Sequence, residues 1–149
     1  FSSQDNVSLL ALAVKYTGDL RLSLLVWAIF TGLIAVFFLG GLLRDNLLPR
    51  PKVLECAALM LLVPLVSPLG WDYTFLLAVL GLTLCFRHLA ELPPAWRAVF
   101  AVDAGFIFLS LYDLLGRRLY AGFMALSLPT YFFLVLLIFL FRLRWKKLA

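Results

Sequence analysis

The sequence predicts an all-α integral membrane protein, a polytopic helix bundle with about five membrane crossings and an N-terminal amphipathic surface helix. Three observations predict this fold. Of the 149 residues, 64% are hydrophobic and only 14% are charged, whereas soluble domains carry roughly 25% charged residues. The apolar residues form long runs without charges, and basic residues gather between these runs. So few charged side chains could not surround a soluble core of that size.

Residues 1–20 are the least apolar part of the chain. Polar side chains such as Asp5 and Asn6 are suitable N-caps, and apolar residues then recur with helical spacing up to Thr17 and Gly18, where glycine favours a helix end. An amphipathic helix of this kind lies in a membrane surface. We expect residues 1–20 to form such a helix on the extracytoplasmic face.

The apolar runs that follow predict the membrane spans. Residues 22–43 carry no charge and would form a helix of about 33 Å, enough for a hydrocarbon core of about 30 Å. The tract 53–86 would be about 51 Å long, too long for one crossing, and Pro64, Pro68 and Gly70 predict that it breaks into two helices. The expected spans lie near residues 22–43, 53–66, 73–86, 98–115 and 125–141.

Lysine and arginine predict the orientation, because they concentrate in cytoplasmic loops. If the N-terminal segment is outside, most basic residues fall inside, and the C-terminus is cytoplasmic. The break at residues 67–73 then lies on the outer face. The inside residues would be Arg44, Arg50, Lys52, Arg87, Arg97, Arg142, Arg144, Lys146 and Lys147, and the outside ones Lys15, Arg21, Arg117 and Arg118.

Polar side chains from three segments should therefore meet on the outer face: the N-terminal helix, the break at residues 67–73, and the turn that holds Arg117 and Arg118. An arginine pair on the face that usually avoids positive charge suits an anionic lipid headgroup or a phosphate, because guanidinium groups bind such oxygens bidentately. The alternative is an interfacial anchor in which Asp113 pairs with Arg117 at i, i+4.

Other carboxylates have structural alternatives. Asp72 either caps the following helix or belongs to the site. Asp103 lies shallow in its span, so snorkelling or pairing with Arg97 or Arg87 is favoured over a proton relay. Glu55 is close to Lys52 and has the same interpretation.

No cofactor or metal is expected. The sequence holds no phosphate-binding loop, nucleophile elbow, zinc-protease motif or dinucleotide fingerprint. Cys56 and Cys85 both lie inside apolar runs, where cysteine behaves as a small apolar residue. The basic C-terminal residues directly follow a span, so they are better explained as a topology signal than as a nucleic-acid site.

Two short stretches resemble motifs of glycosyltransferase family 87, the polyprenyl-phosphate-sugar-dependent mannosyltransferases of the type C membrane fold. Residues 65–73, Leu-Val-Ser-Pro-Leu-Gly-Trp-Asp-Tyr, are similar to the family's Ser-Pro-Ile-Ser-Trp motif, and residues 5–9, Asp-Asn-Val-Ser-Leu, to an upstream Asn-Gln-Ser-Leu segment. Lys15 follows at helical distance, as a basic residue does there. Gly70 replaces a small polar residue, and Asp72 and Tyr73 stand where the family often has histidine.

The resemblance implies that residues 1–149 are one membrane-embedded region, the C-terminal part of a longer enzyme that works with the rest of its own chain. It would move a sugar, expected to be mannose, from a polyprenyl-phosphate donor to an extracytoplasmic or lipid-linked acceptor. The catalytic base would lie in an earlier outside loop, so this segment alone would be inactive. Implied substrate-binding residues are Asn6, Ser8, Lys15, Ser67, Trp71, Asp72, Tyr73, Arg117 and Arg118.

Expected partners are the lipid-linked sugar donor and membrane lipids, with no nucleic acid. Two alternatives come from other classes of protein. A transporter or flippase would use the break at residues 67–72 as a discontinuous-helix binding site, and a non-catalytic membrane scaffold would leave the outer polar groups dispersed.

Overall fold

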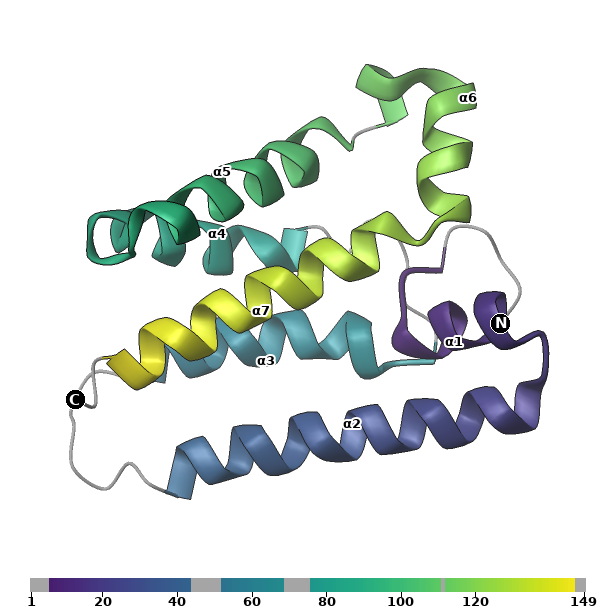
Figure 1. Ribbon diagram of the computed structural model, residues 1–149, viewed down its shortest axis with the longest axis horizontal. Helices are drawn as coiled ribbons and strands as arrows, with labels where there is room; N and C mark the ends of the chain where they lie inside the picture. Colours follow the sequence, from purple (N-terminus) through teal and green to yellow (C-terminus); the bar gives the residue numbers. More distant parts are fainter. Residues whose placement is uncertain (1–5, 44–51, 69–75, 111, 147–149) are drawn as a thin grey trace.

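The computed structural model describes residues 6–43, 52–68, 76–110 and 112–146, and within these ranges the chain is helical with no strand (Figure 1). The all-α prediction is confirmed. A 3₁₀ turn, Leu89–Glu91, lies between α4 and α5. The seven α-helices of the described ranges are α1 Leu9–Thr17, α2 Leu20–Leu43, α3 Lys52–Val66, α4 Ala78–Arg87, α5 Pro94–Leu109, α6 Tyr112–Ala125 and α7 Leu128–Lys146.

Helix α1 begins and ends where local chemistry dictates. Ser8 is the N-cap, and its hydroxyl accepts a hydrogen bond from the Ala11 amide at 3.1 Å. Gly18 is the expected C-cap, with a left-handed φ of 67° and its amide bonded to the Val14 carbonyl. Leu10 and other α1 residues are almost fully buried by neighbouring helices, so α1 is packed into the bundle. Its position at a membrane surface stays a prediction.

Helix α2 is long, apolar and mostly uncovered. Its stretch Leu20–Gly40 has the length and hydropathy of a membrane span. Large side chains along it point away from the other helices, including Leu25 at 58%, Leu33 at 63% and Val36 at 70% exposure. A helix this exposed is not the buried core helix of the bundle, and its outer face has no polar covering.

The expected five spans are not borne out. Within the described ranges one helix, α2, is long and apolar enough to cross a membrane, or two if α5 and α6, which meet at 101°, form one bent span. Helices α3, α4 and α5 have 15, 10 and 16 residues, shorter than the roughly 20 residues of a crossing. A break near Ser110 divides the apolar run 98–115, which the sequence suggested was continuous.

Helix α7 is the centre of the packing and lies against α3, α4, α5 and α6. Buried side chains of α7 such as Phe133 and Leu136 belong to the core, and α4 packs against α7 at Gly81. A Cβ built on Gly81 would stand 3.3 Å from Leu140 and 3.4 Å from Leu61. A larger residue here would press against the ends of leucine side chains where α4 crosses α3 and α7.

The connections between the helices lie at two ends of the molecule (Figure 1). One end holds α1, the start of α2, the end of α3, α6 and the start of α7. At the opposite end, Arg144 of α7 forms an ion pair with Glu55 of α3. The expected association of Glu55 with Lys52 is therefore replaced by a contact between distant helices, because α3 and α7 run side by side.

Candidate functional site

The two motif-like stretches meet at a hydrogen-bonded junction. The Asn6 side-chain amide donates to the Pro68 carbonyl at 2.9 Å, and the Ser8 hydroxyl donates to the same oxygen at 3.3 Å. Asn6 also orders its own segment, because its Oδ1 accepts from the Ser8 amide at 3.0 Å. Both side chains are buried. Residues separated by about 60 positions thus share one carbonyl oxygen.

The end of α3 explains why this junction forms. The last carbonyls of a helix have no partner within the helix and must find one elsewhere. The Val66 carbonyl accepts from the Trp27 indole Nε1 of α2 at 3.1 Å. The Pro68 carbonyl accepts from Asn6 and Ser8. Side chains from α2 and from the segment before α1 therefore complete the C-terminus of α3 and hold residues 66–68 in place.

The turn between α6 and α7 is the third segment that is hydrogen-bonded at this junction. The Lys15 ammonium donates to the Met124 carbonyl at 2.8 Å, and the Thr130 hydroxyl donates to the Val7 carbonyl at 2.8 Å. Between them Ser127 has a φ of 52°, a left-handed conformation that is uncommon for serine. The Ser127 hydroxyl is buried and has no hydrogen-bond partner in the described part of the chain.

The arginine pair lies on the same helix as Met124, about 10 Å away along its axis. Arg117 and Arg118 are exposed, and no hydrogen bond or ion pair joins them to any residue that the structure describes. The alternative pairing of Asp113 with Arg117 is not formed. Gly116 between them has φ 69° and ψ 164°, which interrupts the helical spacing that an i, i+4 pair requires.

The site residues predicted from the sequence are thus partly brought together. Asn6, Ser8 and Lys15 converge on residue 68 and the α6–α7 turn. Ser67 directly precedes Pro68, is half-buried, and donates its amide to the Val63 carbonyl at 3.0 Å. The remaining predicted residues of the break, Trp71, Asp72 and Tyr73, lie outside the described residues.

Sequence reasoning did not identify Trp27, Ser127 and Thr130 as parts of this junction. Trp27 and Thr130 each lie in an apolar helix, where their single polar atoms donate to carbonyls more than 30 residues away. Only the polarity of Thr130 within an apolar run could have suggested a specific contact. The left-handed turn at Ser127 has no sequence signal, because serine rarely adopts it.

Asp103 behaves differently from the expectation. Its side chain is 3% exposed, and neither carboxyl oxygen has a hydrogen-bond partner within the described ranges. Arg97, an expected partner, instead donates to the Leu92 and Ala90 carbonyls, both at 2.8 Å. The Arg97 guanidinium therefore binds carbonyls of the turn before α5. No group of three or more metal-binding side chains occurs among the residues that the structure describes.

Comparisons with known proteins identify no relative: no family model, curated protein or solved structure matches this chain.

Proposed function

We propose that this chain is the C-terminal, membrane-embedded part of a glycosyltransferase. It moves a sugar, expected to be mannose, from a polyprenyl-phosphate donor to an extracytoplasmic or lipid-linked acceptor. The observation that carries the proposal is the junction at Pro68. The two stretches that resemble motifs of glycosyltransferase family 87 lie far apart in sequence, yet Asn6 and Ser8 of one bind the Pro68 carbonyl of the other.

A location in the membrane is part of the proposal and is supported by α2. Residues 22–43 contain no charged side chain, and most of the apolar side chains on this helix are exposed. Exposed apolar surface of that extent is costly in water and favourable in lipid. We place α2 across the membrane and the rest of the bundle beside it. The N-terminal segment is outside and the C-terminus is cytoplasmic.

The proposed chemistry divides between this chain and the rest of the enzyme. Transfer at an anomeric carbon needs a base for the acceptor hydroxyl and stabilisation of the departing phosphate. Arg117, Arg118 and Lys15 are cations at the junction end of the bundle, and we assign them to the phosphate. Ser67, with Trp71, Asp72 and Tyr73 directly after the junction, is assigned to the sugar or the acceptor, with the base supplied by an earlier segment.

Substitution of the arginine pair tests this assignment. In the full-length protein, Arg117→Gln with Arg118→Gln should raise the KM for the lipid-phosphate donor by roughly 10- to 100-fold, since a hydrogen bond to a charged group contributes about 1.5–3 kcal/mol. The measurement is the rate of sugar transfer at varied donor concentration. Arg87→Gln, an exposed arginine at the end of α4, is the matched control. Unchanged kinetics in the double variant would remove the pair from the site.

A further inference from the structure

The carboxyl group of Asp103 lies in the core of the bundle. Its side chain is 3% exposed, and neither carboxyl oxygen has a hydrogen-bond partner in the described part of the chain. The buried residues of α5 recur at helical spacing, and the others are apolar. They are Phe100, Asp103, Ala104 and Ile107. Asp103 therefore stands in a packed face where an apolar side chain is the usual choice.

Aromatic contacts hold α5 against α7 on both sides of Asp103. The Phe100 ring lies edge-on to Phe139, with centroids 5.3 Å apart, and the Phe106 ring stacks on Phe132 at 5.0 Å. Asp103 lies between these contacts along α5, three residues from each of its phenylalanines. A carboxylate loses its hydration in such surroundings, so its charge is stabilised only if a cation or several hydrogen-bond donors replace the water.

The described ionisable groups of α4 and α5 do not provide that cation. Cys85 of α4 is buried and close enough to Asp103 for an electrostatic interaction, but a thiol carries no positive charge. Arg87 at the end of α4 is exposed, and His88 after it binds a carboxylate of the 3₁₀ turn at 2.7 Å. Arg97 of α5 is bound to carbonyls of the same turn.

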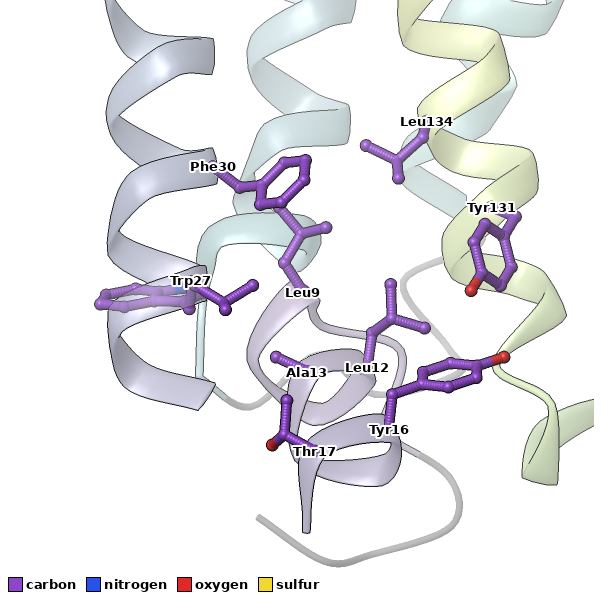
Figure 2. Close-up of a pocket in the computed structure, with 10 residues that line it drawn as sticks. Leu9, Leu12, Ala13, Tyr16, Thr17, Trp27, Phe30, Tyr131 and Leu134 are labelled. Carbon is purple, nitrogen blue, oxygen red and sulfur yellow. The ribbon is translucent and has the colours of Figure 1, made fainter. Parts of the chain in front are cut away.

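The described ionisable groups of α7 are also engaged elsewhere. Tyr131 faces the apolar pocket between α1, α2 and α7, where Figure 2 shows its ring close to Tyr16 of α1. Arg142 lies over a tryptophan ring at 4.3 Å, and Arg144 is paired with a carboxylate of α3. A charge on Asp103 would therefore be unpaired among the residues that the structure describes, so this packing favours the neutral acid.

Helix α5 is held to the bundle by the face that contains Asp103. It packs mainly on α7, and Phe86 of α4 adds an edge-on ring contact with Phe100 at 4.9 Å. Its other side chains are uncovered, including Val102 at 58% and Leu109 at 59% exposure. Ionisation of Asp103 would place an unpaired charge inside this face and would therefore oppose the whole contact.

We propose that Asp103 is a pH-sensitive switch that controls the packing of α5. With the carboxyl group protonated, α5 packs on α4 and α7. When the group ionises, α5 separates from α7, and water reaches Asp103 and Cys85. The packed state binds this proton more tightly than the open state does, so a rise in pH favours the open state. The loss of packing begins above about pH 4, where an aspartate in water ionises.

The switch would also act on the arginine pair. Helix α6 follows α5 in the chain and carries Arg117 and Arg118. Separation of α5 from α7 would therefore displace both guanidinium groups. This consequence rests on the proposed function, whereas the switch itself does not.

The accessibility of Cys85 tests the switch. The full-length protein, with Cys56 and Cys85 as its only cysteines, is treated with a maleimide in detergent at several pH values. The rate at Cys85 is divided by the rate at Cys56, which is exposed and reports the greater reactivity of thiols at higher pH. The wild-type ratio should rise roughly tenfold or more between about pH 5 and pH 8. A ratio that does not change with pH would overturn the proposal.

Variants of the carboxyl group separate the switch from general loosening of the protein. Asp103→Asn is neutral at every pH, so its ratio should stay low and constant, and Asp103→Leu should behave alike if the asparagine variant does not fold. Asp113→Asn is the matched control, because Asp113 is exposed, and it should keep the wild-type rise. The same rise in the neutral Asp103 variants would assign the opening to another group. The transfer assay of the Arg117 and Arg118 variants is independent of these outcomes.

Discussion

Single hydroxyl and amide groups hold the candidate site together. Ser8 caps α1 through Ala11 and also binds the Pro68 carbonyl, so one oxygen stabilises both a helix and a contact between distant segments. Asn6 also makes one local and one distant contact. Its Oδ1 accepts from the Ser8 amide, and its Nδ2 donates to the Pro68 carbonyl. Asp5 and Asn6 suggested a helix start, although Ser8 is the N-cap, and the sequence contained no information about the partner carbonyl. That partner is about 60 residues away, beyond the reach of any local pattern.

Two serines provide a matched test at this scale. Ser8→Ala should lower the free energy of unfolding by about 1–2 kcal/mol, because it removes the N-cap of α1 and leaves buried groups without a partner. Ser127→Ala should be neutral or slightly stabilising, because the Ser127 hydroxyl is buried without a partner among the described residues. Thermal unfolding in detergent, followed by circular dichroism, measures both. Equal losses of stability would contradict the assigned role of Ser8.

Glycine has opposite roles in different elements. Gly18 ends α1 with a φ of 67°, and a Cβ at this position would meet no atom within 4 Å. Gly32 lies inside α2 and is equally open. Substitution at either position therefore changes backbone preference without a steric clash. The end of α1 at Gly18 was predictable from sequence because this conformational need is local.

Gly18→Ala should destabilise the protein by about 1–2 kcal/mol, because alanine in a left-handed conformation is strained. Gly32→Ala should stabilise it by up to about 1 kcal/mol, since alanine is the better helix former. Melting temperatures of the two variants against wild type give the comparison. A higher melting temperature for Gly18→Ala would show that the left-handed cap is not needed.

Element lengths were less predictable than element types. The apolar run 98–115 suggested one span, but α5 ends at Leu109 and α6 begins at Tyr112 at a steep angle. Gly116 then interrupts α6, which separates Asp113 from Arg117. Hydropathy alone does not report such bends, because the side chains on both sides of the bend remain apolar.

At the scale of the molecule, the helices divide the connections between two ends. The candidate site, including α1 and α6, lies at one end, and the Glu55 and Arg144 pair lies at the other (Figure 1). If α2 crosses the membrane, these two ends face opposite sides. The orientation is then set by the basic residues that the sequence places near the second end.

Cysteine labelling measures this orientation. In a full-length protein without its native cysteines, Leu119→Cys, exposed on α6, should react with a membrane-impermeant maleimide in intact cells. Arg87→Cys, exposed at the end of α4, should react only after permeabilisation. The reverse pattern would invert the proposed topology, and labelling of both positions in intact cells would argue against a spanning bundle.

The sequence by itself determined the helical class, the charge-free helix at residues 22–43, and helix ends such as Gly18, because apolar periodicity and turn chemistry act over a few residues. Only the tertiary structure decided that α1 is buried, that Asn6 and Ser8 bind the Pro68 carbonyl, and that Glu55 pairs with Arg144. Those outcomes depend on which helices pack together. Packing is set by the shapes of whole faces, such as the close approach at Gly81, and no short motif encodes it.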